Sequence, residues 1–249
     1  CVFLKTFLSF IFIVDYAIIS PMKTLVILAG GKSTRMGKDK IFLHLHDNET
    51  FLEHLYHIAS GFFERIIISA GSEGHAAEIQ KLLPGAEVVA DQYAEKGPMG
   101  GLVSVYEQTG VSMFAVIPVD VPFADMDVLA FFYEHCSDSA CVLTDGGHAE
   151  PLIGAYGRQM LKTLKKRLEN EDYRMYAALS EDVMHYSFTE LQEQITGKTE
   201  EELKAAFCNI NTESDTTHKK NCCFIKRNVW QSLQNRGRNP PCLSNCRRT

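Results

Sequence analysis

A glycine-rich segment near the start of the chain combines close-approach glycines with two cations. Residues Leu28–Lys40 read LAGGKSTRMGKDK, with the cations at Arg35 and Lys40. Glycine lets a backbone approach a ligand closely and offer its N–H groups to phosphate oxygens. A guanidinium can bind two phosphate oxygens at once, and an ammonium adds a point charge. The segment therefore predicts a site for a triphosphate.

Two familiar nucleotide-binding motifs are excluded by the spacing in this segment. A P-loop needs a glycine five residues before the glycine of its Gly-Lys-Ser/Thr. Here Gly31-Lys32-Ser33 places Val26 at that position. The adjacent pair Gly30-Gly31 also lacks the spaced glycines of a dinucleotide-binding fingerprint.

Two carboxylates and a second glycine-rich turn follow later strand-like runs. Asp120 lies in Pro118–Phe123 (PVDVPF), and Mg²⁺ prefers one or two carboxylates together with phosphate oxygens and water. Asp91 offers the hydrogen-bond acceptors of a carboxylate just before this second turn. Gly97–Leu102 (GPMGGL) predicts a helix start whose N–H groups suit an anion or a base edge. The plainer interpretations are a surface turn at Asp91 and a helix cap at Asp120, although Asp125 is better placed for a cap.

The elements that must position these residues alternate between strand and helix. Continuous apolar runs predict strands buried on both faces at Thr24–Ala29, Arg65–Ala70, Ala86–Ala90, Ser112–Pro118 and Ser139–Thr144. Helical stretches separate them at Thr50–Ser60, Gly74–Leu83, Gly100–Gln108 and Asp125–His135. This succession predicts an α/β fold, a Rossmann-like three-layer sandwich with a mostly parallel sheet. Ligands of such sheets bind at the carboxyl ends of the strands, where the candidate residues lie.

The string Leu-x-Gly-Gly-x-Ser-x-Arg-Met-Gly-x-Asp-Lys over Leu28–Lys40 resembles the signature loop of the MobA family, the molybdenum cofactor guanylyltransferases. Related cytidylyltransferases tend to have Ala-Ala-Gly where this chain has Ala29-Gly30-Gly31. Sugar-phosphate nucleotidyltransferases tend to have Pro-Lys in place of Asp39-Lys40. Both differences favour the guanylyl branch, and the resemblance extends over residues 23–215.

The resemblance implies a nucleotidyltransferase fold of the GT-A-like type and transfer of GMP from GTP to the terminal phosphate of molybdopterin. It implies Mg²⁺ held by Asp120 and catalytic roles for Arg35, Lys40 and Asp120. The resemblance also assigns Asp91 to the guanine nucleotide, since a carboxylate can accept hydrogen bonds from the N1–H and 2-amino group of guanine, a donor pair that cytosine lacks. It also implies contact with other proteins that make or accept the molybdenum cofactor. The residues expected to bind the substrates are Leu28, Ala29, Gly30, Gly31, Lys40, Asp91, Gly97, Gly100, Asp120, Asn209 and Asn211.

Other segments match the family less closely. Glu150-Pro151-Leu152 has glutamate where the family usually has glutamine, and Asn209-Ile210-Asn211-Thr212 resembles an asparagine element that approaches the pterin. Turn-forming asparagines are the plainer interpretation of the second segment. Family members often carry an asparagine near the nucleotide after the second strand, where this chain has Ser69–Ser72 (SAGS). That contact is the main departure from the pattern.

The two ends of the chain differ from its body. Residues 1–21 are mostly apolar and are expected to be translated upstream sequence before Met22, with a membrane anchor or signal as the alternative. The tail, residues 216–249, carries eight Lys/Arg and no Asp or Glu, and is expected to be disordered or non-native. The net charge of −6, less the tail's +8, leaves −14 for residues 22–215, the expected nucleotidyltransferase domain. A body this acidic argues against nucleic acid as a partner.

Cysteine usage indicates a reducing, cytoplasmic location. Only three of the eight cysteines lie in the acidic body, which is too few for a disulfide scaffold. Cys136 and Cys141 are expected in the core, while the tail cysteines match no strong zinc pattern. Neither the pair His44 and His46 nor the pair His54 and His57 has an accompanying ligand set.

Three alternatives stay open. A sister enzyme could use CTP or a different phosphate acceptor. A non-catalytic nucleotide-binding or regulatory domain could use the same fold. A membrane-anchored or nucleic-acid-binding protein would depend only on the two ends of the chain.

Overall fold

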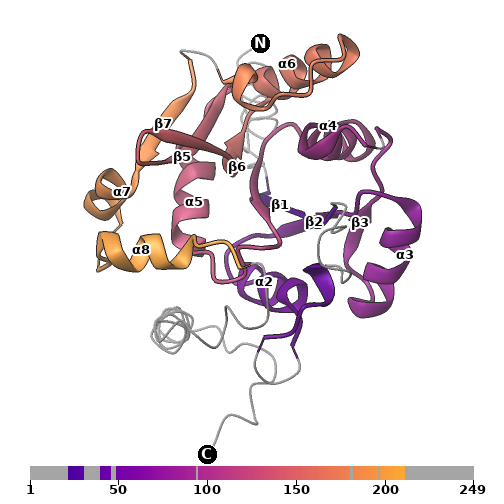
Figure 1. The fold of residues 1–249 in the computed structure, drawn as a ribbon, viewed down its shortest axis with the longest axis horizontal. Coiled ribbons are helices and arrows are strands. Elements are labelled where there is room, and N and C mark those ends of the chain that lie inside the picture. Colours follow the sequence, from indigo (N-terminus) through magenta and orange to yellow (C-terminus); the bar gives the residue numbers. More distant parts are fainter. Residues whose placement is uncertain are drawn as a thin grey trace, which may run out of the picture.

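Short runs of apolar residues form the strands of one seven-stranded sheet (Figure 1). The computed structural model describes residues 22–30, 40–45, 49–93, 95–179, 182–195 and 197–210. The strands are β1 (Thr24–Leu28), β2 (Arg65–Ser69), β3 (Glu87–Val89), β4 (Phe114–Pro118), β5 (Ala140–Asp145), β6 (His148–Tyr156) and β7 (Met184–Ser187). Their order across the sheet is β3-β2-β1-β4-β6-β5-β7.

Most neighbouring strands are parallel, which confirms the predicted class of sheet. β1 pairs in parallel with β2 and β4, β2 with β3, and β5 with β7. β6 is antiparallel to both β4 and β5. The sequence analysis did not predict β6 or β7, and the sheet is therefore more mixed beyond β4 than the steady alternation suggested.

Helices cover both faces of the sheet, as expected of a three-layer sandwich (Figure 1). The helices are α2 (Phe51–Ala59), α3 (Glu73–Leu82), α4 (Gly97–Thr109), α5 (Met126–His135), α6 (Arg158–Glu169), α7 (Phe188–Gln194) and α8 (Glu200–Ala206), with short 3-10 turns η1 (Lys40–Phe42) and η3 (Tyr176–Ala178). Side chains of β1 alternate between two cores because successive residues of a strand point to opposite faces. Leu25 and Ile27 join α2, α3, α5, α7 and α8 in one core, and Val26 and Leu28 join α4 and α6 in the other.

The predicted elements of the first half agree with the structure to within a few residues. Each of the five predicted strands exists, with ends that differ by at most two residues. α4 begins at Gly97, three residues before the predicted range, and has Pro98 in its first turn. Proline is tolerated there because the first N–H groups of a helix have no partner within it.

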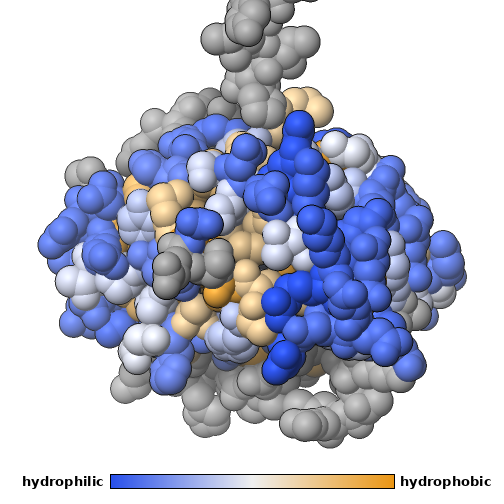
Figure 2. All heavy atoms as spheres, turned by 90° about the horizontal axis from the view of Figure 1, so that it is seen from above, coloured by the Kyte–Doolittle hydropathy of each residue, from blue (hydrophilic) through white to orange (hydrophobic). Residues whose placement is uncertain are grey.

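The outer helix α6 separates apolar and charged side chains cleanly. Met160, Leu161, Leu164 and Leu168 are buried, whereas Lys162 and Lys166 are exposed. Figure 2 looks down from the side on which α6 lies in Figure 1, and hydrophilic side chains cover most of that face around a smaller hydrophobic area. Among the residues described, no helix is long and apolar enough to cross a membrane.

The described cysteines are unlinked. Cys136, Cys141 and Cys208 are free thiols, and the first two are buried as expected. Burial raises the pKa of both Cys136 and Cys141 to about 12. Both are therefore inert core residues at neutral pH. The leader and the basic tail, including the cysteines considered for zinc, lie outside the described residues.

The close approach of β5 and β6 yields a prediction. A Cβ at Gly154 would lie 2.2 Å from the carbonyl oxygen of Cys141 and 3.0 Å from Cα of Val142. Because both are backbone atoms, Gly154→Ala should destabilise the fold by about 3 kcal/mol, at the upper end of overpacking costs. Urea unfolding would measure the change.

Gly74 in α3 provides the matched control, since a Cβ there would meet nothing within 4 Å. Gly74→Ala should leave stability unchanged or raise it by about 0.5–1 kcal/mol through lower backbone entropy in the unfolded chain. Equal stabilities of the two variants would contradict the close strand contact.

Candidate functional site

The ends of four parallel strands meet at one edge of the sheet. Leu28 of β1 lies opposite Ser69 of β2 and Pro118 of β4. Backbone bonds continue one residue past the strands, from Ala29 N–H to Ser69 O (2.9 Å), Val119 N–H to Leu28 O (3.0 Å) and Ala70 N–H to Val89 O (2.9 Å). The segments that follow β1, β2, β3 and β4 are therefore neighbours, as the parallel topology predicted.

The first glycine of the β1 loop touches the loop after β2. Gly30 is exposed, and a Cβ on it would lie 2.8 Å from both Cα and N of Gly71. Leu28 and Ala29, also expected at the site, are buried just before it. Gly31, Arg35 and the side chain of Lys40 lie outside the described part of the chain, although the backbone of Lys40 begins η1. Their roles stay predictions.

The carboxylate of Asp91 is half-buried and held from the neighbouring strand. The Ser69 hydroxyl donates a hydrogen bond of 2.9 Å to Oδ1 of Asp91. Burial raises the pKa of Asp91, and the bonds from the Ser69 hydroxyl and the Gly71 N–H partly offset that rise by favouring the ionised form. Asp91 is therefore more than a surface turn residue.

The first turn of α4 packs tightly against this carboxylate and against the loop after β3. A Cβ on Gly100 would lie 2.7 Å from Tyr93 O, and one on Gly101 would lie 2.6 Å from Ser69 Oγ. Gly97 is exposed with φ of 64°, a conformation that glycine adopts without strain. No side chain caps this helix start within the described residues. The first N–H groups of a helix have no partner within the helix, and this helix start lies close to Asp91.

Asp120 lies at the carboxyl end of β4 in a buried turn. Val121 N–H bonds to Pro118 O (3.2 Å) and Ala124 N–H to Val121 O (3.2 Å). Asp120 itself is half-buried, and its carbonyl accepts a 2.8 Å bond from Ile210 N–H. Asp125 caps α5, as expected, by accepting from the N–H groups of Asp127 and Val128.

The bond from Ile210 brings the end of the described chain to the Asp120 turn. Asn209, the residue before it, is exposed beside that turn, while Asn211 lies outside the described residues. The antiparallel β6 adds a further segment, since Val116 of β4 lies opposite Gly154 and the chain before Gly154 runs toward the same edge. Glu150 is exposed there, and burial and the nearby Asp145 raise its pKa.

The register between β5 and β6 shifts beside Glu150. Val142 lies opposite Gly154, but the next residue, Leu143, lies opposite Glu150. The residues between bulge out of the ladder, and Pro151 has no N–H to donate. The buried Tyr156 hydroxyl donates a 2.5 Å bond to the carbonyl of Pro151 and fixes the bulge. Bulges of this kind redirect side chains near functional sites.

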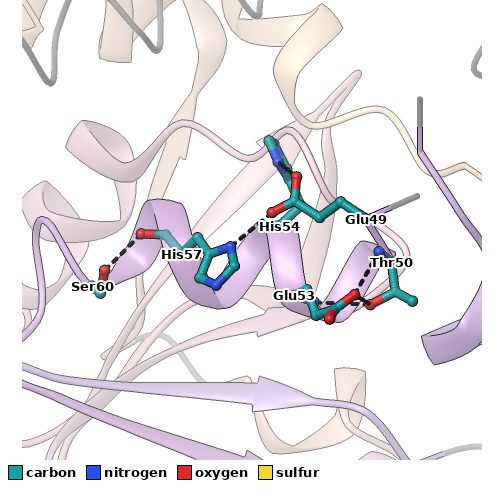
Figure 3. A network of polar contacts seen from close by, with 6 residues as sticks. All are labelled: Glu49, Thr50, Glu53, His54, His57 and Ser60. Atoms are coloured by element: carbon teal, nitrogen blue, oxygen red, sulfur yellow. Dashed lines mark hydrogen bonds and ion pairs between the residues drawn. The ribbon is translucent and has the colours of Figure 1, made fainter. Parts of the chain in front are cut away.

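The carboxylate of Glu49, just before α2, bridges two histidines on that helix (Figure 3). Oε2 of Glu49 lies 3.0 Å from Nδ1 of His54, and Oε1 lies 2.7 Å from Nδ1 of His57. The His54 ring meets Phe123 edge-on, with ring centroids 5.7 Å apart. The two histidines, for which the sequence analysis found no accompanying ligand set, thus share a carboxylate partner.

This bridge shifts two pKa values in opposite directions. Burial would raise the pKa of Glu49, but hydrogen bonds and charge interactions with the two histidines outweigh it and lower the pKa to about 2. The hydrogen bond that His57 donates to the Glu49 carboxylate raises the pKa of His57. The sequence analysis missed this network and the Ser69–Asp91 bond. A polar residue at the end of the apolar β2 was the only signal for the latter.

Comparison with known proteins bears on the family and the fold of the chain. The MobA-like NTP transferase domain matches residues 25–184. The chain is 28% identical over 194 residues to the molybdenum cofactor guanylyltransferase of Syntrophotalea carbinolica, covering 76% of this chain and 87% of that protein. It is 30% identical over 163 residues to a probable molybdenum cofactor guanylyltransferase of Rhodopirellula baltica, covering 62% of this chain and 77% of that protein.

A solved structure shows the same fold. Molybdopterin-guanine dinucleotide biosynthesis protein A of Archaeoglobus fulgidus superposes with a TM-score of 0.67 at 21% identity, covering 81% of this chain and 98% of that one. A nucleotidyl transferase of Methanothermobacter superposes with a TM-score of 0.57 at 16% identity, covering 85% of this chain and 99% of that one.

The Glu49 bridge predicts a pH-dependent contribution to stability. The lowered pKa of Glu49 contributes stability above its ordinary value of 4.5, which is lost as pH falls toward about 2. The raised pKa of His57 contributes stability below its ordinary value of 6.5, which is lost as pH rises through the raised value. Glu49→Gln should therefore lower the free energy of unfolding most between pH 4.5 and 6.5.

The cost should be at most about 1 kcal/mol, because solvent screens partly exposed pairs. Melting temperatures across pH would measure it, with Glu78→Gln on the exposed side of α3 as the control. A cost for Glu49→Gln that does not vary with pH would contradict the ion pairing.

Proposed function

Because the chain belongs to the MobA-like NTP transferase domain family, we propose that this nucleotidyltransferase transfers GMP from GTP to the terminal phosphate of molybdopterin and releases pyrophosphate. The names of its curated relatives support this choice of substrates. The observation that carries it is the convergence of Gly30, Asp91, α4 and Asp120 at the carboxyl edge of the parallel strands.

The guanine base binds at Asp91. A carboxylate held on one side by Ser69 has acceptor sites left for the N1–H and 2-amino group of guanine. The N–H groups at Gly97 and Gly100, in the first turn of α4, suit an electronegative edge or phosphate. Cytosine lacks the paired donors, so GTP is favoured over CTP.

The triphosphate binds along the loop that starts at Leu28, Ala29 and Gly30. Backbone N–H groups at Gly30 and Gly31 face phosphate oxygens, while Arg35 and Lys40 neutralise the charge that builds up as the bond to pyrophosphate breaks. Asn209 and Asn211 serve the pterin, since Ile210 between them is bonded to the Asp120 turn.

Asp120 suits a divalent cation. Its half-buried carboxylate ends a parallel strand beside the phosphate loop, and Mg²⁺ needs only one or two carboxylates when phosphate oxygens and waters complete its shell. When bound, Mg²⁺ supplies positive charge to the phosphates. No group of three potential ligands exists among the described residues, so the cation would depend on the nucleotide for part of its coordination.

The reaction needs little covalent chemistry from the protein. A terminal phosphate oxygen of molybdopterin forms a bond to the α-phosphorus of GTP in line, and the bond between the α-phosphorus and the bridging oxygen breaks. Pyrophosphate leaves with the electron pair. The chain orients the two substrates and stabilises the developing charge. The free thiols of the described residues fit the cytoplasmic location proposed with this activity.

Pyrophosphate release tests the proposal directly. The protein is incubated with molybdopterin, Mg²⁺ and each nucleoside triphosphate in turn. We expect release with GTP only. Faster release with CTP would favour the sister cytidylyltransferase, and nucleotide binding without release would favour a non-catalytic domain.

Lys40→Ala should reduce turnover by about 100- to 1,000-fold, the usual cost of removing one charge-stabilising group. The fold should survive because the change leaves Ile41, the buried core residue of η1, in place. Lys162→Ala on the exposed side of α6 is the matched control and should leave turnover unchanged. Turnover of Lys40→Ala within a few-fold of the parent would remove Lys40 from the mechanism.

A further inference from the structure

Ser69 is a buried hydroxyl at the end of an apolar strand. Its side chain is only 1% exposed, and it lies 22 residues before Asp91, to which it donates the 2.9 Å bond. A side chain so fully covered cannot reach a nucleotide itself. Any effect on the ligand must therefore pass through Asp91.

The space around this bond is filled from a third element. A Cβ on Gly101 would lie 2.6 Å from Ser69 Oγ, 3.4 Å from Asp91 Oδ2 and 3.4 Å from the side chain of Leu28. The carboxylate thus lies between Ser69 at the end of β2 and Gly101 near the start of α4. Rotation of the carboxylate out of its present plane would break its bond to Ser69.

The number of acceptor sites on the Asp91 carboxylate matches a base with two adjacent donors. A carboxylate offers about four lone-pair sites. Ser69 and the Gly71 N–H use two of them. The remaining sites can accept the N1–H and the 2-amino group of one guanine only if the carboxylate plane is fixed relative to the base.

We propose that Ser69 is a positioning residue that fixes the plane of the Asp91 carboxylate and thereby sets the preference for guanine over bases that lack the 2-amino group. This inference rests on the proposed function of Asp91. It assigns to Ser69 an indirect role, through Asp91, rather than a contact with the nucleotide. Gly101 is part of the same arrangement, because a side chain at that position would collide with the hydroxyl of Ser69.

Binding of GTP and ITP with Mg²⁺, measured by calorimetry, tests the specificity. Inosine lacks the 2-amino group, so the parent protein should bind GTP more tightly than ITP. Ser69→Ala should weaken GTP binding about tenfold or more, as expected for a lost bond to a charged group. It should weaken ITP binding less, so that the ratio of the two dissociation constants falls.

Ser104→Ala provides the matched control. Ser104 is another fully buried serine, and its hydroxyl accepts a 2.9 Å bond from Gln92 N–H, next to Asp91. It holds the same loop without touching the carboxylate. Ser104→Ala should leave the GTP-to-ITP ratio unchanged. An equal change in both variants, or no change in Ser69→Ala, would overturn the positioning role.

A second test does not depend on nucleotide. Gly101→Ala should destabilise the parent because its Cβ meets Ser69 Oγ, and most of that loss should disappear in the Ser69→Ala background, where the oxygen is gone. In the nucleotide-free protein, the pKa of Asp91 measured by NMR should rise in Ser69→Ala.

These outcomes separate the two proposals. Additive stability changes together with an unmoved Asp91 pKa would overturn the Ser69 inference while leaving GTP transfer intact. Parent protein that neither binds nor uses GTP, with the stability coupling and pKa change present, would overturn the proposed function. It would also confine the role of Ser69 to holding Asp91.

Discussion

The hydrogen bonds that extend the parallel ladder past the ends of β1, β2 and β4 are the constraint on which the site depends. They join Ala29 to Ser69, Val119 to Leu28 and Ala70 to Val89. Each bond ties the start of one loop to its neighbour, so the loops leave the sheet side by side. Glycine at positions 30, 100 and 101 then permits backbone contacts that a Cβ would block. The strand register thus determines where the site lies, and side chains at the edge of the sheet complete it.

The partial burial of Asp91 at this site has an electrostatic cost. Burial disfavours its charged form, and the Ser69 and Gly71 donors offset only part of that penalty, because the pKa of Asp91 is still raised. A carboxyl group whose pKa is raised in the folded protein lowers the stability of the fold as pH rises through that raised pKa. Functional sites commonly retain such groups since the unsatisfied acceptor capacity is what a ligand uses. At the α2 bridge the balance is reversed, and Glu49 is strongly stabilised in its charged form.

The sequence predicted the part of the fold that is buried on both faces. β1 and β4 read as continuous apolar runs because helices cover them from both sides, and their order along the chain implied parallel pairing. The sequence analysis missed β6 because it relied on strands that alternate with helices. β6 instead follows β5 as an antiparallel neighbour, and a bulge at Pro151 interrupts its pairing. The position of Asp91 followed from the motif, but its bond to Ser69 did not. That contact depends on the register of β2 against β3 and on the packing of Gly101 against Ser69, and neither can be read from local sequence.

The central claim is that GTP lies along the carboxyl edge of β1 to β4. Backbone amide chemical shifts, recorded as GTP and Mg²⁺ are added, test it most directly. The account predicts the largest changes at Gly30, Gly71, Asp91, Gly100 and Asp120, with little change along the exposed side of α6. Changes concentrated on α6 or around α7 and α8, with these five amides unmoved, would contradict it.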